Sequence, residues 1–272
     1  MAVKTHPRTL PRGRAALARV AARARPFVDV STVAAVLQVD SKRAAKQLAR
    51  WNEQGFVRRI RRGIYAIVPA AAAMQENIVM DPWVLVPTLF REAYVAGWSA
   101  AEHWDLTEQV FTTLRVCTTD AIKRTDIEVS GVSLRARHIP ASQWFATAAT
   151  WHEGTRVLVS DLQKTILDMF IDPELGGGIQ HVAHCFREYL RRSDADVSTL
   201  VVYATKADYA PAFKRMGFVC EVVGGPARLR DECLRHVTLG LANLDSAIVS
   251  PRVSKRWQLR LPRAWEKVLS DG

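Results

Sequence analysis

Basic side chains cluster between residues 42 and 62 at spacings that suit contact with a nucleic acid. One group, the basic helix face, recurs every three or four residues, as on one side of a helix; it comprises Lys42, Arg43, Lys46, Gln47 and Arg50. A second group, the arginine hairpin, comprises Arg58, Arg59, Arg61 and Arg62. Lysine and arginine bind phosphates and guanine edges, and glutamine pairs with adenine. A basic face alone is also typical of a solvated surface helix, so the surrounding elements must decide.

Clusters of histidine, cysteine and acidic residues elsewhere are candidates for catalysis or metal binding. The first cluster is Glu102, His103 and Asp105, and the second is His181, His184 and Cys185. Their spacing does not require a metal site, and a helix-capping pattern that begins at Ser99 explains the glutamate without catalysis. We therefore predict no catalytic residue, no metal ligand, no cofactor and no enzymatic activity. The alternative is a nuclease or transferase with a C-terminal active site.

Two phosphate-binding patterns are incomplete in this chain. A nucleotidyltransferase needs a Gly-Ser pair followed shortly by two carboxylates that hold metal and nucleotide. Here Asp194 and Asp196 follow Ser99 only after 95 residues or more. The three glycines at 176–178 could cradle a phosphate, but no Gly-Lys-Ser/Thr follows them. We expect them to form a loop before a helix.

The elements that would position the basic residues lie between residues 15 and 68. Apolar periodicity predicts helices over 15–23, 32–37 and 41–52, with Ser31 capping the second and Asp40 or Ser41 the third. On the third helix, Ala45, Leu48 and Trp51 are expected to face inward, with Ala44 and Ala49 beside them. Strands over 56–60 and 64–68, joined by a turn at 61–63, complete the segment. Three helices followed by a basic hairpin predict a winged helix-turn-helix domain.

The excess of positive over negative charge is concentrated at the same end of the chain. Residues 1–75 hold 15 Lys and Arg against 3 acids, a net of +12, whereas the remainder holds 23 against 24, a net of −1. A module that binds a polyanion concentrates charge in this way. We predict a DNA-binding domain over 1–75, with a flexible arm over 1–13, and a second domain over 76–272. The basic, acid-free residues 1–26 also resemble a mitochondrial transit peptide, but their direct continuation into the winged pattern favours the first helix of the DNA-binding domain.

The second domain is expected to mix helices and strands without regular βαβ order. Strands are predicted near 94–95, 111–118, 127–139 (as a hairpin), 157–159 and 259–262; helices are predicted near 82–91, 99–104, 162–170, 179–190, 198–204 and 210–216. The fold class is therefore α+β. Four cysteines without a CxxC pair indicate free thiols and a cytoplasmic location, and no apolar run is long enough to span a membrane.

Four stretches of the chain resemble the AbiEi antitoxins of type IV toxin–antitoxin systems. They are RRGIYAIVP (61–69), YVAGWSAAEHWDLTEQ (94–109), VSDLQKTILDMFIDPELGGGI (159–179) and FKRMGFVCEVVG (213–224). The resemblance runs from about residue 14 to 262 and does not cover the N-terminal arm.

The resemblance implies a transcriptional autorepressor of an abortive infection system. Its winged domain would bind double-stranded DNA at inverted repeats in the promoter of its own operon. Its C-terminal domain would counteract an AbiEii-like nucleotidyltransferase toxin without forming a stable complex. An RNA-binding adaptor that uses the same basic residues is a further alternative.

Overall fold

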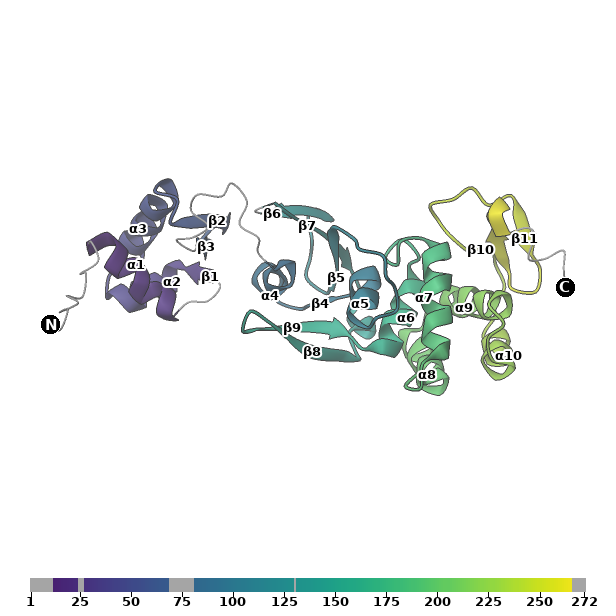
Figure 1. Ribbon diagram of the computed structural model, residues 1–272. Helices are drawn as coiled ribbons and strands as arrows, with labels where there is room; N and C mark the ends of the chain where they lie inside the picture. Colours follow the sequence, from purple (N-terminus) through teal and green to yellow (C-terminus); the bar gives the residue numbers. More distant parts are fainter. Residues whose placement is uncertain (1–11, 24–26, 69–80, 130, 266–272) are drawn as a thin grey trace. The chain divides into compact units, whose positions relative to one another are not determined.

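The computed structural model describes residues 12–23, 27–68, 81–129 and 131–265 (Figure 1). These residues form a mixed α+β protein, as predicted. The chain divides into two compact units. The first holds residues 1–88, 128–132 and 151–156, and the second holds 89–127, 133–150 and 157–272. The domain boundary predicted near residue 75, and residues 1–11 of the predicted arm, lie outside the described residues.

Three helices open the first unit: α1 (Arg12–Arg23), α2 (Val30–Leu37) and α3 (Ser41–Glu53). Arg12 and Gly13 are therefore helical and do not belong to an arm. The cap of α2 is Asp29 and not Ser31, because the Asp29 carboxylate accepts a hydrogen bond from the Thr32 N–H at 2.7 Å. The cap of α3 is Asp40, one of the two predicted residues.

A three-stranded antiparallel sheet in the order β1-β3-β2 completes this part of the unit. The predicted hairpin consists of β2 (Val57–Arg61) and β3 (Ile64–Ile67), whereas β1 (Phe27–Asp29) was not predicted. Because β1 pairs with β3, it ties the hairpin to the chain between α1 and α2. The core beneath these elements is formed by Val20, Val28, Val33, Val36, Ala44, Leu48, Trp51, Val57 and Tyr65.

A six-stranded sheet follows, in the order β6-β7-β5-β4-β9-β8. Its strands are β4 (Ala93–Val95), β5 (Thr113–Thr118), β6 (Asp126–Val129), β7 (Val132–His138), β8 (Thr147–His152) and β9 (Thr155–Ser160). β5 runs parallel to β7 and antiparallel to β4. The predicted 127–139 hairpin is present, with its turn residue Ser130 outside the described residues, and β8 was not predicted. The same stretch of the chain also contains short helical segments: η1 (Pro82–Leu85), α4 (Val86–Leu89), α5 (Gly97–His103) and η2 (Ala141–Gln143).

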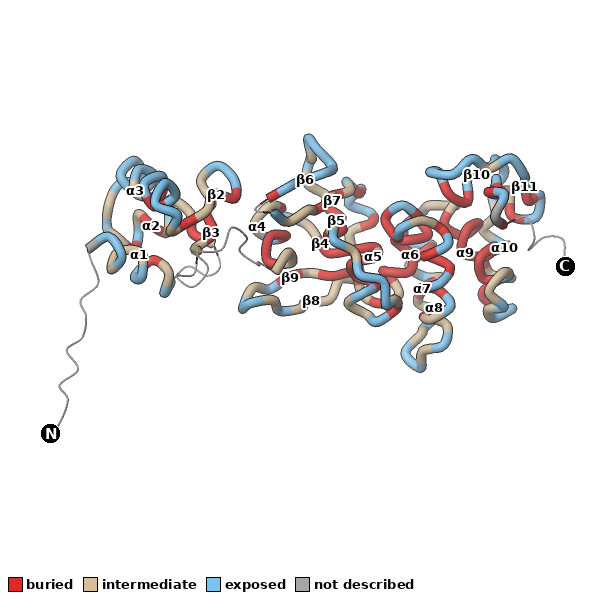
Figure 2. Tube along the Cα trace, turned by 45° about the horizontal axis from the view of Figure 1, so that its top comes forward, coloured by how far each residue is buried: buried red, intermediate tan, exposed pale blue. Residues whose placement is uncertain are grey.

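The rest of the second unit is mainly helical. Its elements are α6 (Leu162–Ile171), α7 (Ile179–Arg191), α8 (Val197–Ala207), α9 (Ala210–Val222), α10 (Ala227–Arg235), a small sheet β10 (Ala242–Asn243), β11 (Arg252–Ser254) and β12 (Leu259–Leu261), and η3 (Arg263–Trp265). α6 is buried along nearly its whole length (Figure 2). Among the described helices, none has the length and apolar character needed to cross a membrane.

Two sequence predictions about these helices are wrong. The Ser99 side chain does not cap a helix; instead its hydroxyl accepts the Arg115 N–H at 3.0 Å, and α5 begins earlier, at Gly97. Helix α9 does not end at Gly217 but continues to Val222. The glycine is needed for packing, since a Cβ there would lie 2.1 Å from the ring of Trp257.

Candidate functional site

The basic helix face lies on the solvent side of α3. Successive residues of an α-helix are turned by about 100°, so buried Ala44, Leu48 and Trp51 share one side, and the exposed side chains lie opposite. Lys42, Arg43, Lys46 and Arg50 are exposed, and Gln47 is half-buried at the edge of the face. Of the residues predicted to face inward, Ala44, Leu48 and Trp51 are buried, whereas Ala45 and Ala49 are exposed, so the prediction is wrong for these two.

The arginine hairpin brings its four residues to the turn between β2 and β3. Arg59, Arg61 and Arg62 are exposed and Arg58 is half-buried. The register shifts between Arg59 and Arg61, which leaves Ile60 as an extra residue of a bulge. The bulge lets Val57 and Ile60 both be buried although they are three residues apart. At the tip Gly63 adopts a φ of 84°, which a side chain would strain.

Hydrogen bonds fix the hairpin to the end of α3. The Asn52 side-chain oxygen accepts the Arg59 N–H at 2.9 Å, and the Trp51 carbonyl accepts the Phe56 N–H at 2.9 Å. Both bonds join the last turn of the helix to the start of the hairpin. The end of α3 and the arginine hairpin are therefore fixed to each other.

Asp40 and Arg14 contact residues of the basic helix face and of the start of the hairpin. The Arg43 side chain pairs with the exposed Asp40 carboxylate at 3.4 Å, across a contact that water screens strongly. Arg14 of α1, which was not among the predicted site residues, is exposed and lies 5.4 Å from the centre of the Phe56 ring. Arg19 serves α1 differently, because its guanidinium donates to the Val36 carbonyl at 3.0 Å.

The histidine and cysteine cluster on α7 is held by internal contacts. His181 Nδ1 donates to the Gly176 carbonyl at 2.6 Å, and Nε2 accepts from the Thr107 hydroxyl at 2.9 Å, as a neutral ring does. Burial lowers the pKa of His181, although the bond to Gly176 opposes this. His184 is exposed and Cys185 is buried. Within the described residues, His, Cys, Asp and Glu form no group of three or more that could hold a metal ion.

The cluster at the end of α5 has a different arrangement. Glu102 and Asp105 are both exposed, and His103 packs edge-to-face against Trp104 with ring centres 4.8 Å apart. Asp105 adopts a positive φ of 55°, in the turn that leaves the helix. The two aspartates of the Asp194–Asp196 pattern are also engaged locally. Asp194 pairs with Arg192 at 2.8 Å, and Asp196 caps α8.

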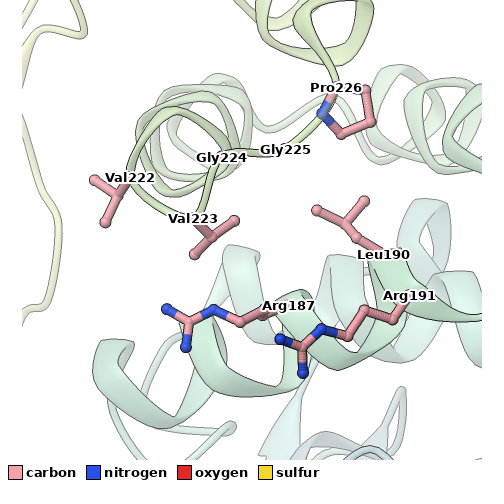
Figure 3. Close-up of a pocket in the computed structure, with 8 residues that line it drawn as sticks. All are labelled: Arg187, Leu190, Arg191, Val222, Val223, Gly224, Gly225 and Pro226. Carbon is pink, nitrogen blue, oxygen red and sulfur yellow. The ribbon is translucent and has the colours of Figure 1, made fainter.

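A cavity of about 710 Å³ lies between α7 and the turn that joins α9 to α10 (Figure 3). Arg187, Leu190 and Arg191 line it from α7, and Val222 to Pro226 line the other side. Arg191 is paired with Glu188 at 2.7 Å. The N–H groups of Gly224 and Gly225 donate to the carbonyls of Glu221 and Cys220, which ends α9, so these donors do not serve a ligand.

Comparison with known proteins assigns the chain to no family. No family model matches it, and no curated protein matches it significantly.

Proposed function

We propose that residues 12–67 form a winged helix-turn-helix that binds duplex DNA. The observation that carries the proposal is the hydrogen-bonded junction between the end of α3, which bears the basic helix face, and the arginine hairpin. α2 and α3 form the helix pair, in which the exposed face of the second helix enters the major groove. The arginine hairpin would contact phosphates or the minor groove beside it.

The residues proposed to bind DNA fall into two groups, those that would contact base edges and those that would contact phosphates. Arg43 and Gln47, in the first half of α3, lie where such helices reach base edges, and they favour guanine and adenine respectively. Lys42, Lys46 and Arg50 are directed to phosphates, as are the hairpin arginines. The proposal therefore combines sequence-specific contacts on α3 with sequence-independent contacts on the hairpin.

The resemblance to AbiEi antitoxins extends this proposal to a biological role. The protein would act in the cytoplasm and repress its own operon by binding inverted repeats in the promoter. Its second domain would oppose a nucleotidyltransferase-like toxin without a stable complex. The four buried, free cysteines are compatible with a reducing compartment.

Binding to the protein's own upstream DNA tests the DNA-binding proposal. Fluorescence anisotropy would compare a labelled duplex from the upstream region with a random duplex of equal length. We expect tighter binding to the upstream duplex, and Gln47→Ala should weaken that binding by about 1–3 kcal/mol while sparing the random duplex. Arg187→Ala, which removes an exposed arginine from α7, is the matched control and should change neither. Equal wild-type affinity for both duplexes would reject the specific repressor.

Co-expression tests the antitoxin role. The neighbouring open reading frame is expected to encode a nucleotidyltransferase-like protein, whose induction arrests growth. Co-expression of the full chain should restore growth, and variants of the arginine hairpin should restore it equally when driven from an independent promoter. Failure of the wild-type chain to restore growth would remove the antitoxin role and leave the DNA-binding proposal standing.

The alternatives have separate tests. An RNA-binding adaptor would bind RNA at least as tightly as duplex DNA of equal length in a direct competition. A nuclease or transferase would show metal-dependent turnover of bound nucleic acid, and that turnover would be lost on substitution of Glu102 or His181.

A further inference from the structure

Three arginines of the second unit gather on one face of the six-stranded sheet. β5 and β7 are parallel neighbours, with Arg115 opposite Arg135 and Cys117 opposite Arg137. Alternate residues of a strand share a face, so all three arginines lie on the same side of the sheet. The loop at residues 172–175, between α6 and α7, borders the same face, because the Glu174 carbonyl accepts from Arg115 Nη2 at 3.0 Å.

Two of these guanidinium groups retain unused donors. Arg115 is only 5% exposed and stacks 3.9 Å from the centre of the Trp98 ring, yet its Nε–H has no partner among the described residues. Arg137 pairs through Nε with Asp172 at 3.0 Å, while its buried Nη1 also lacks a partner among them. Buried donors of this kind are costly, and native proteins leave few of them unsatisfied. Both donors belong to side chains that line one cavity, which indicates a site for an acceptor.

A cavity of about 350 Å³ opens where these arginines meet. Its charged lining consists of Arg115, Arg135 and Arg137 with Asp172 and Glu174. A third carboxylate, Asp126, pairs with Arg135 from outside the lining. Ile122 and Leu175 add apolar surface. The volume lies at the small end of the range of about 300–1,000 Å³ that holds small molecules.

The electrostatics of the cavity favour an anion. Arg135 pairs with Glu174 at 2.8 Å and with Asp126 at 3.4 Å, so it is largely compensated. Among the described residues, Arg115 forms no ion pair with a carboxylate. Burial lowers the pKa of Arg115 and the neighbouring charge of Arg135 lowers it further, although the more distant carboxylates of Glu174, Asp172 and Asp126 oppose this. An anion in the cavity would relieve both effects.

We propose that this three-arginine cavity binds the phosphate group of a small phosphorylated ligand. A tetrahedral phosphate presents three terminal oxygens that can accept from separate guanidinium groups, whereas a single carboxylate presents two in one plane. Arg115 and Arg137 would supply their unused donors, and Arg135 would stand beside them. The remaining volume and the apolar wall of Ile122 and Leu175 would hold the group that carries the phosphate. The proposal is independent of DNA binding, since none of these residues belongs to α3 or its hairpin.

Titration calorimetry on the full chain, at ionic strength held constant with KCl, tests this site. The probes are inorganic phosphate, pyrophosphate and adenosine monophosphate, with citrate as the carboxylate comparison. Arg137→Gln and Arg135→Gln are the test variants, because both side chains are partly exposed and their loss is less disruptive than that of buried Arg115. Arg156→Gln is the matched control: it removes one exposed arginine from β9 of the same sheet. The basic helix face is unchanged in every variant, so its own binding of phosphate cancels.

We expect Arg156→Gln to bind the phosphate probes with the wild-type Kd. Arg137→Gln should bind them about ten- to a hundredfold more weakly, as loss of a charge-assisted hydrogen bond requires, and circular dichroism should confirm its fold. Arg135→Gln should weaken binding as well. The same Kd in all four proteins, or no binding by the wild type, would overturn the site. Citrate binding as tight as that of phosphate would overturn the assignment of the ligand class.

Discussion

Salt dependence offers the sharpest test of the proposed DNA-binding surface. Each phosphate that the protein neutralises releases counterions, so log K falls with log salt with a slope of about −0.9 per contact. The exposed candidates for phosphate contact are Lys42, Lys46, Arg50, Arg59, Arg61 and Arg62. Six contacts predict a slope of about −5, and binding should weaken by roughly a thousandfold between 50 and 200 mM salt.

Removing two of these contacts should change the slope by a calculable amount. The Arg59→Ala/Arg62→Ala variant leaves four contacts, so its slope should be about −3.6 and its loss over the same salt range only about 150-fold. The backbone of the hairpin should persist, because Asn52 binds the Arg59 N–H and not its side chain. Binding to random and upstream duplexes should weaken together, since phosphates carry no sequence information.

Fluorescence anisotropy at five or more salt concentrations measures the slope directly. The control is Arg187→Ala/Arg228→Ala, which removes the same charge from exposed positions on α7 and α10. Its slope should equal that of the wild type. If the two double variants have the same slope, net charge alone governs binding, and the proposal that α3 and the hairpin form the DNA-binding surface is wrong.

Three further predictions concern the second unit. Gly217→Ala should lower the free energy of unfolding by about 1 kcal/mol or more in urea, because the clash with Trp257 outweighs the helix propensity of alanine, whereas Gly13→Ala on open α1 should not destabilise. Lys164→Met should cost about 3–5 kcal/mol in the same assay, because it strands the buried Asp168 carboxylate; an exposed-lysine control, Lys123→Met, should be neutral. Burial raises the pKa of Cys117 to about 12, so its thiol is protonated at pH 8; native protein should resist a thiol reagent there that labels all four cysteines after unfolding, and rapid labelling of native Cys117 would contradict this burial.

Much of the first unit could be predicted because its signals are local. The periodicity of α3 placed Leu48 and Trp51 in the core, and the turn at Gly63 placed the hairpin. The errors arose where two local solutions compete. Ala44 and Ala45 are identical in chemistry, so only the angle around the helix separates them. The short strand β1 carries no alternation, since it is defined by its partner β3.

The second unit was less predictable because long-range packing decides its elements. Glycine often ends a helix, so Gly217 is a plausible end for α9, yet the helix continues through it. The glycine is there because the ring of Trp257, forty residues later, packs against the helix where a Cβ would lie. The capping pattern at Ser99 failed for the same reason. The Ser99 hydroxyl accepts a hydrogen bond from the N–H of Arg115 on β5. The sequence predicts this strand, but it does not predict that the strand lies beside α5.

Charge counting shows why one candidate site was visible in the sequence and the other was not. The first 75 residues carry a net of +12 in one block, so their sum alone indicates a polyanion-binding surface. The three-arginine cavity lies in a domain whose net charge is −1, and there Arg135 and Arg137 each pair with a carboxylate. Only the parallel pairing of β5 and β7 sets Arg115, which forms no ion pair among the described residues, beside Arg135. A surface for a long polyanion can therefore be found by summing charge, whereas a site for one phosphate depends on which residues the fold leaves uncompensated.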